Sequence, residues 1–253
     1  MASIKTRGII LRRRAYGEAD RILTILTPGM GKLTAIAKGV RRLSSKLGGS
    51  MELFYVVDWV LSEGRTWYVV TSAEVVESQQ HIQQSLDRVE QASYLARLVD
   101  RLAPEEESQP KMYALLLDAI RELPNAHAIV MLRLIEWQLL LAAGLQPELR
   151  MCSHCGGVLD PQRLGLCPDR GGALCPTCLQ TEALHILIQP ETLKILRLFQ
   201  RAPISLAGRL QVQASIQDEL ARITSAFLSH ALETKLVVPT SARLQQTPIE
   251  ILS

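Results

Sequence analysis

The chain has 253 residues, of which 47% are apolar and 21% are charged, a composition typical of a folded globular protein and unlike that of disordered chains. Its most apolar stretch, residues 127–144, contains Arg133 and Glu136 and therefore lacks the roughly 20 uncharged residues that a membrane span requires. The N-terminal segment has an apolar run of only about four residues, shorter than the roughly 7–15 of a signal peptide. These features predict a cytoplasmic protein without membrane contact.

Positive charge is concentrated in residues 1–50, which contain eleven Lys or Arg residues and only two acidic ones, Glu18 and Asp20. This segment has a net charge of +9, whereas the remainder of the chain has −6. Such a division favours one module that binds a polyanion and a second that is an ordinary or partner-facing body. The alternative is that the basic residues only solvate a small sheet.

Short runs of β-branched and aromatic residues, separated by turn signals, predict strands in the first 80 residues. The predicted strands are residues 6–12, 21–27, 32–40, 52–62 and 66–72. Five short strands in about 75 residues fit a small closed barrel, because closure removes exposed strand edges. We expect a barrel of the OB type.

Apolar residues recur at helical spacing after this region, which predicts helices at residues 86–102, 111–123 and 126–143, with Gly144 at the left-handed position after the third. Residues 150–180 show no periodicity, and helical patterns return at residues 191–201 and 211–235. The predicted class is an α+β multidomain protein. The expected parts are an OB barrel (1–80), a helical domain (81–150 and 183–238) with a zinc-binding insertion (151–182), and a loosely ordered tail (239–253).

Two Cys-x-x-Cys pairs, Cys152 with Cys155 and Cys175 with Cys178, are separated by nineteen residues. This spacing is typical of a four-cysteine zinc site, and in a reducing compartment it favours metal binding over disulfides. Glycines flank both pairs and allow tight turns. Because the segment has few apolar residues, we expect its order to depend on the metal.

Two other side chains in this segment, Cys167 and His154, are possible competing ligands, but neither belongs to a Cys-x-x-Cys pair. We interpret Cys167 as a packed or exposed thiol. Four protein ligands leave no position for an activated water, so the sequence predicts a structural Zn²⁺. Reduced, metal-free cysteines are the alternative.

The positive charges form two clusters near predicted strand ends, where barrel loops are free to contact a ligand. The candidate DNA-binding residues are Arg12, Arg13, Arg14, Lys38, Arg41, Arg42 and Lys46. Lys and Arg neutralise phosphates, and OB folds combine such charge with aromatic side chains that stack on bases. Aromatic candidates in the last two strands are Phe54, Tyr55, Trp59, Trp67 and Tyr68. The alternative is that most of these rings fill the barrel, but neighbouring strand residues cannot both point inward, so we expect some rings to pack and others to be available for stacking.

Several stretches of the chain, read together, resemble a known family. They are GIILRRRAYGEADR (8–21), Thr27, GKLTAIAKG (31–39) with Arg41, Arg42, Ser45 and Lys46, then RLIE from Arg133 through Gly144 and Pro147 to the first cysteine pair, and Gly171-Gly172 before Cys175. These stretches are similar to the barrel, middle helix and zinc motif of RecO, a family of bacterial recombination mediators. The similarity spans most of the chain.

The resemblance implies a non-enzymatic protein that binds single- and double-stranded DNA, anneals complementary strands, and works with RecR to replace single-strand binding protein by RecA, with a functional link to RecF. It implies that Lys38, Arg41, Arg42 and Lys46 form the basic DNA-binding loop. It also implies that the helical domain recognises the acidic tail of single-strand binding protein, for which Arg121 and Arg133 are candidates. A nucleoid-associated location follows from these roles.

Two other classes of protein are alternatives to this hypothesis. A zinc-dependent nuclease or deaminase would need an open metal site and an His-x-Glu arrangement, which the sequence lacks. A zinc-stabilised adaptor that binds only protein is the remaining alternative. Glu18 and Asp20 lie among arginines and are better explained as braces of the basic loops than as a catalytic carboxylate pair.

Overall fold

The computed structural model of the chain describes residues 3–45, 47–123 and 128–234. Lys46 and the predicted tail, residues 239–253, lie outside these ranges. The chain divides into two compact units, residues 1–125 with 138–144 and residues 126–137 with 145–253, and each is described by itself. No helix within the described ranges is both long and apolar enough to cross a membrane.

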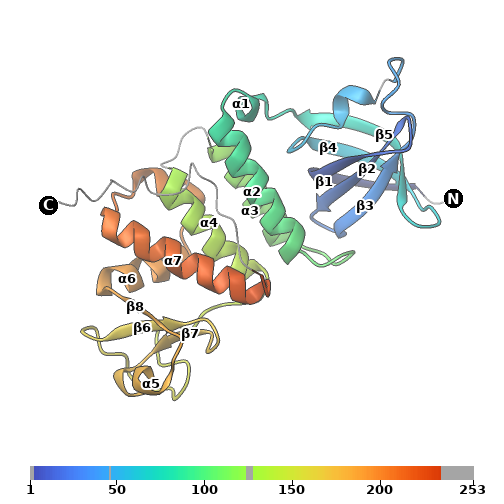
Figure 1. The fold of residues 1–253 in the computed structure, drawn as a ribbon. Helices are drawn as coiled ribbons and strands as arrows, with labels where there is room; N and C mark the ends of the chain where they lie inside the picture. Colours follow the sequence, from blue (N-terminus) through green and yellow to red (C-terminus); the bar gives the residue numbers. More distant parts are fainter. Residues whose placement is uncertain (1–2, 46, 124–127, 235–253) are drawn as a thin grey trace, which may run out of the picture. The chain divides into compact units, whose positions relative to one another are not determined.

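The first unit begins with a closed five-stranded barrel (Figure 1), as predicted. Its strands are β1 (Ser3–Tyr16), β2 (Asp20–Thr27), β3 (Gly31–Ala37), β4 (Val56–Ser62) and β5 (Tyr68–Glu77), and a short 3-10 turn spans Gly48–Ser50. The order β1-β2-β3-β5-β4 closes on β1, with antiparallel neighbours except for the short parallel pairing of β3 with β5. This is the strand arrangement of an OB-type barrel.

Strand β1 is longer than predicted because it pairs on both sides. Its first half, from Ser3, pairs with β4, and its second half, to Tyr16, pairs with β2. The register shifts between Ile10 and Arg12, which marks a bulge that bends the strand and helps the sheet to close. Strand β4 starts later than predicted, because Phe54 has φ of 69° and cannot continue a strand.

Alternate side chains of the strands point inward and form the core of the barrel. The buried core includes Ile10, Leu23, Ile25, Leu33, Ala35, Val57, Trp59, Leu61 and Val70. Burial of this apolar surface, at about 25 cal/mol per Å², is the main force that holds the barrel closed. The rigid barrel then fixes the positions of its loops.

Three helices follow the barrel within the first unit: α1 (Gln80–Gln83), α2 (Leu86–Leu102) and α3 (Pro110–Glu122). Helix α2 packs on β1 and α3, and α3 reaches β2. The predicted apolar stripe of α2 is buried at Ala92, Leu95, Leu98 and Val99, whereas Leu86 at its start is exposed. Asp100 on the same helix forms ion pairs with Lys32 at 3.5 Å and Arg12 at 3.6 Å, so charge as well as apolar contact joins the helix to the barrel.

The second unit contains most of α4 (Ala128–Ala142) and the helices α6 (Pro190–Phe199) and α7 (Ala214–Ala231), with a 3-10 turn at Ile204–Arg209 between the last two. A small sheet of order β7-β6-β8 lies between α4 and α6 in the sequence (Figure 1). Its strands are β6 (Leu164–Cys167), β7 (Gly172–Leu174) and β8 (Ile186–Ile188), and the short helix α5 (Pro176–Thr181) follows β7.

Residues 150–180 show no periodicity and few apolar residues in the sequence, yet the structure forms a small sheet and a small apolar cluster there. Leu174 and Leu179 are buried with the cysteines in a small cluster of their own. Gly165 makes this packing possible, because a Cβ at that position would lie 2.4 Å from the Leu179 side chain. The strands are too short for periodicity to reveal them.

Candidate functional site

The four paired cysteines converge on one point of the second unit. The Sγ atoms of Cys152, Cys155, Cys175 and Cys178 all lie within 4.8 Å of one another, and those of Cys155 and Cys175 are 3.7 Å apart. Tetrahedral zinc with Zn–S bonds of about 2.3 Å requires sulfur atoms about 3.8 Å apart. The cluster is therefore compatible with a metal site.

A tight turn shapes the first half of this cluster, and the second half leads into α5. After the first pair, Gly156 has φ of 72° and donates its N–H to the Cys152 carbonyl oxygen at 2.9 Å, while the Cys152 N–H donates to the Gly157 oxygen at 2.9 Å. Ser153 is tied to the Ala173 carbonyl oxygen by its N–H at 2.8 Å and its hydroxyl at 3.1 Å. The backbone thus holds the two cysteine pairs together before any ion is considered.

The ionisation of the thiols shows why a cation suits this cluster. Burial opposes ionisation of Cys152, but N–H groups of Cys155, Cys175 and His154 outweigh it and lower the pKa of that thiol to about 6. Burial and the neighbouring sulfur atoms raise the pKa of Cys178 to about 12. The cluster thus favours a thiolate at Cys152 and opposes ionisation of Cys178, and a cation among the sulfur atoms would offset the second charge.

Cys167 and His154 do not join the four clustered sulfur atoms. Cys167 is fully buried at the end of β6 and packs in the small apolar cluster, whereas the His154 side chain is exposed. Cys167 is thus a packed thiol.

The three consecutive arginines of β1 have different surroundings, because strand residues alternate between two faces. Arg12 forms an ion pair with Asp100, and its Nε and Nη2 atoms each donate to the Thr24 hydroxyl oxygen at 3.4 Å. Arg13 points to the opposite face and pairs with Glu52, which lies 3.8 Å from Arg21 as well. Arg14 is exposed and forms no ion pair with any described residue.

The loop after β3, residues 38–45, is here called the basic loop; Lys38, Arg41 and Arg42 are exposed on it. It is fastened to the turn between β1 and β2. The Gly39 N–H donates to Asp20 Oδ1 at 2.7 Å, the Arg41 N–H donates to the Ala19 oxygen at 2.9 Å, and Arg41 Nη1 donates to the Gly17 oxygen at 3.2 Å. Asp20 therefore braces the basic loop, although through a backbone N–H rather than through a salt bridge.

Most of the aromatic candidates pack in or against the barrel core. Trp59 is 1% exposed in the barrel core, Phe54 is 5% exposed, and Tyr55 and Tyr68 pack against the core. The aromatic pair that remains at the surface is Trp67 with Tyr16, whose ring centroids are 5.4 Å apart in an edge-to-face contact; Tyr16 is 47% exposed. Tyr16 was not among the predicted aromatic candidates, because it lies at the end of β1 and not in the last two strands; its position directly after the arginine cluster is the signal that could have identified it.

The two candidate partner-binding arginines are both engaged inside their own units. Arg121 forms an ion pair with Glu77 at the end of β5, yet its side chain is 48% exposed. Arg133 is 1% exposed and lies 3.1 Å from Glu136, whose carboxylate accepts a hydrogen bond from Thr224 of α7 at 2.5 Å. The interpretation of Arg133 as a surface group for a partner's carboxylate is corrected here, because α4 turns it toward α7 and not toward solvent.

Comparison with known proteins adds a second line of evidence. Residues 1–79 match the family "Recombination protein O N terminal", and residues 83–238 match "Recombination protein O C terminal". Three curated relatives, each named "DNA repair protein RecO", illustrate the similarity. The protein from Roseiflexus sp. (strain RS-1) is 37% identical over 90% of this chain and 81% of its own length. The proteins from Dehalococcoides mccartyi (strain CBDB1) and Pelotomaculum thermopropionicum are 35% and 33% identical, over at least 90% of each chain.

Proposed function

The chain belongs to the RecO family of DNA repair proteins, and from this premise we propose that it binds single- and double-stranded DNA and anneals complementary strands without catalysing a reaction. With RecR, and in functional connection with RecF, it would promote loading of RecA onto strands coated by single-strand binding protein. The observation that carries the proposal is the basic loop, whose Lys38, Arg41 and Arg42 are exposed while the loop itself is fastened to the barrel.

The proposed DNA contact is made mainly by those cations of the two basic clusters that have no acidic partner among the described residues. These are Lys38, Arg41 and Arg42 with Arg14 from β1, and we retain Lys46 as a prediction from the sequence. Arg12 and Arg13 stay in the proposal as secondary contacts, since each already forms an ion pair, Arg12 with Asp100 and Arg13 with Glu52. Tyr16, exposed beside Trp67, is suited to stack on a base.

Annealing needs two polyanions to approach each other, and their mutual repulsion is the main barrier. A fixed set of cations lowers this repulsion by displacing counterions from the phosphates. The basic loop would contact phosphates and not base edges, so its affinity would not depend on the DNA sequence. Annealing of arbitrary complementary strands requires this independence. A nucleoid-associated location in the cytoplasm follows from this substrate.

For the cysteine cluster we propose a structural Zn²⁺ held by Cys152, Cys155, Cys175 and Cys178. Four thiolates fill a tetrahedral shell, so the ion would brace the two turns and activate no water. The tail of single-strand binding protein is proposed to bind the helical part of the chain, where Arg121 keeps a solvent-exposed guanidinium.

The test is the affinity for fluorescent oligo(dT), measured by anisotropy at several salt concentrations, for the natural chain and the Lys38→Glu/Arg41→Glu/Arg42→Glu variant. Three phosphate contacts predict a log–log salt slope of about −2 or steeper, and the variant should lose at least about tenfold in affinity and its annealing activity. The matched control is Arg97→Glu/Arg101→Glu/Lys111→Glu, which makes the same charge change at exposed positions of α2 and α3.

Two results would contradict this proposal. Equal losses in both variants would show that only net charge matters, and the basic loop would then not be the DNA site. Absence of oligo(dT) binding, or a flat salt response, would favour the zinc-stabilised adaptor that binds only protein.

A further inference from the structure

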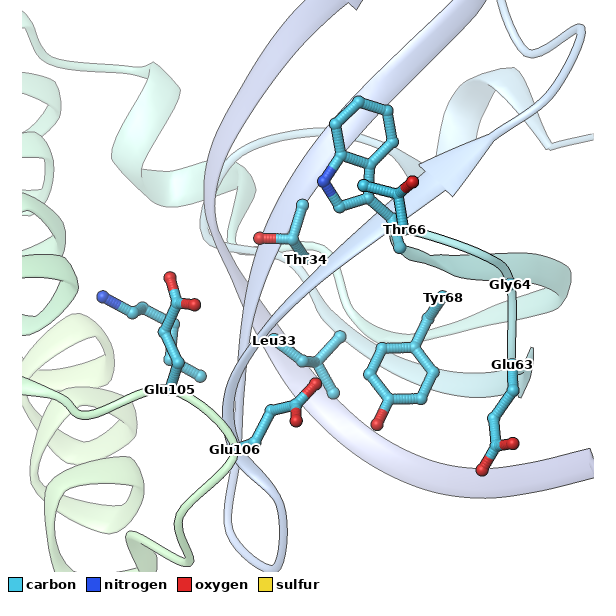
Figure 2. A pocket seen from close by; sticks show the side chains of 10 residues that line it. Leu33, Thr34, Glu63, Gly64, Thr66, Tyr68, Glu105 and Glu106 are labelled. Atoms are coloured by element: carbon cyan, nitrogen blue, oxygen red, sulfur yellow. The ribbon is translucent and has the colours of Figure 1, made fainter.

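A hollow of about 420 Å³ lies on the first unit where three segments meet: β3, the connection from β4 to β5, and the connection from α2 to α3. Figure 2 shows it from close by. The side chains used in the argument are Lys32, Glu63, Trp67, Tyr68, Glu105 and Glu106. We call it the acidic hollow.

The charge of the acidic hollow is opposite to that of the basic loop. Three carboxylates line it, from Glu63, Glu105 and Glu106, against one cation, Lys32. Lys32 is already engaged, because its Nζ lies 3.5 Å from Asp100 Oδ1 and donates to the Asp100 carbonyl oxygen. Within the described part of the chain, none of the three carboxylates forms an ion pair. A phosphate backbone would therefore be repelled here, whereas a cation would be attracted.

The acidic side of the hollow is fixed to the barrel. The Glu106 N–H donates to the Lys32 carbonyl oxygen at 2.9 Å, and the Ser108 hydroxyl donates to the Pro28 oxygen at 3.1 Å. Gly31 permits this close approach, because a Cβ there would lie 1.9 Å from the Glu107 oxygen. The backbone that carries Glu105 and Glu106 is thus held in place before any ligand binds, which lowers the entropic cost of binding.

The opposite wall is aromatic. In Figure 2 the carboxylate of Glu106 is directed toward the ring of Tyr68, with Leu33 beside them. Limited burial and the nearby carboxylates of Glu106 and Glu63 raise the pKa of the Tyr68 phenol, which indicates a negative field in the hollow. Trp67 adds a second ring, steadied by its edge-to-face contact with Tyr16. Aromatic faces next to carboxylates are favourable surroundings for a guanidinium, which stacks on a ring and donates several N–H groups in its plane.

We propose that the acidic hollow receives an arginine side chain of a protein partner, with the guanidinium against Trp67 and Tyr68 and its N–H groups donated to Glu105 and Glu106. Arginine fits better than lysine because it can stack and donate to both carboxylates at once. The carboxylates of the hollow do not belong to the proposed DNA contact, although Trp67 touches Tyr16. Variants of these carboxylates therefore test this proposal without removing any cation of the DNA contact.

The experiment uses the full chain and a nine-residue Gly/Ser peptide with a central arginine, followed by acrylamide quenching of tryptophan fluorescence. Trp59 and Trp137 are 1% and 0% exposed, so quenching reports mainly on Trp67. The arginine peptide should protect Trp67, and the same peptide with citrulline, the neutral isostere, should not. Glu105→Gln/Glu106→Gln should weaken binding of the arginine peptide by roughly three- to tenfold.

The matched control is Glu74→Gln/Glu107→Gln, which removes the same charge from exposed positions outside the lining of the hollow. The control should keep the affinity of the natural chain within about twofold. Equal binding of the citrulline peptide, or an equal loss in both variants, would overturn the proposal. A third result would also overturn it: the Glu105→Gln/Glu106→Gln variant binds oligo(dT) more tightly than the control variant does, while its affinity for the arginine peptide is unchanged. The hollow would then be part of the DNA path and not a site for a protein partner.

Discussion

Asp20 is important for the candidate DNA site although its charge opposes DNA binding. Its carboxylate accepts the Gly39 N–H at 2.7 Å and so fixes the start of the basic loop. Its neighbour Glu18 is exposed and has the same charge. The two residues therefore separate the effect of charge from the effect of loop position.

We expect Asp20→Ala to weaken oligo(dT) binding by about three- to tenfold, because the basic loop loses its brace at a cost of about 1–2 kcal/mol. Electrostatics alone would predict tighter binding, since a negative charge is removed. Glu18→Ala, the control, should bind as tightly as the natural chain or slightly more tightly. Anisotropy titrations measure both affinities, and faster tryptic cleavage after Arg41 or Arg42 in Asp20→Ala would show the loosened loop. If both variants bind more tightly, the brace has no role.

Gly172 is a second residue whose role depends on a close backbone approach. It pairs with Glu148 outside the small sheet, where the Ala173 N–H donates to the Glu148 oxygen at 2.8 Å. A Cβ at Gly172 would lie 2.3 Å from that same oxygen. Gly172 thus has a steric reason to be glycine, which the sequence alone did not provide.

Gly172→Ala should lower the free energy of unfolding by about 2 kcal/mol, because the Glu148 backbone must move away. Gly49→Ala is the control, since no atom lies within 4 Å of its added Cβ. Urea denaturation followed by circular dichroism measures both variants. A Gly172→Ala variant as stable as the Gly49→Ala variant would contradict the steric argument.

At the scale of secondary-structure elements, α7 caps the N-terminus of α6. Glu219 of α7 accepts hydrogen bonds from the Gln189 N–H at 2.9 Å and from the Thr192 hydroxyl at 2.6 Å. Partial burial opposes ionisation, but these hydrogen bonds and the charge of Arg222 outweigh it, and the pKa of Glu219 falls below its ordinary value of 4.5. A negative charge at the start of a helix is also favoured by the helix dipole.

The lowered pKa of Glu219 gives a pH dependence with a defined sign. A carboxylate with a lower pKa in the folded state stabilises the fold fully above its unfolded pKa, and this contribution is lost as the pH falls through the folded value. Glu219→Gln should therefore cost about 1–2 kcal/mol at pH 7, and less and less below about pH 4.5.

Urea denaturation from pH 3 to pH 7 measures this difference. Glu191→Gln is the control on the exposed first turn of α6, where the side chain is 60% exposed and 3.8 Å from Lys194. That control should change stability by less than about 0.5 kcal/mol. A Glu219→Gln penalty that stays constant with pH would show that the carboxylate charge is not involved.

At the scale of the whole molecule, the cysteine cluster and the basic loop belong to different compact units. The small sheet beside the cysteines also has its own apolar cluster, so the proposed zinc is not the only support of that segment. The two family matches meet near residue 80, which is where the barrel domain was predicted to end. The compact units divide the chain differently, because α1, α2 and α3 belong to the same unit as the barrel. The two divisions disagree, so the predicted domain bounds stay a prediction.

Removal of zinc should leave DNA binding intact within about twofold, because the basic loop is fastened to the barrel and not to the cysteine segment. We expect one zinc per chain by elemental analysis of the purified protein. After chelation, the four clustered thiols should react with a thiol reagent much faster than before, since the metal no longer holds them. A tenfold loss of oligo(dT) affinity after chelation would instead place the cysteine segment in the DNA site.

Several features of the protein were determined by the sequence itself, because they depend on neighbours along the chain. The barrel strands, the stripe of α2, the left-handed Gly144 and the two Cys-x-x-Cys turns each follow from residues a few positions apart. The spacing of the cysteines also sufficed to predict that they meet, since each pair forms a local turn.

Tertiary structure alone decided which charged residues are free. Arg13 and Glu52 are 39 positions apart in the sequence and form an ion pair. Thr224 of α7, which lies 88 positions after Glu136, donates a hydrogen bond to Glu136 in its buried pair with Arg133. The acidic hollow likewise joins three distant segments. Contacts between distant segments leave no periodic signal in the sequence, so the sequence located the positive charge in the barrel, and only the fold showed that the basic loop presents it to solvent.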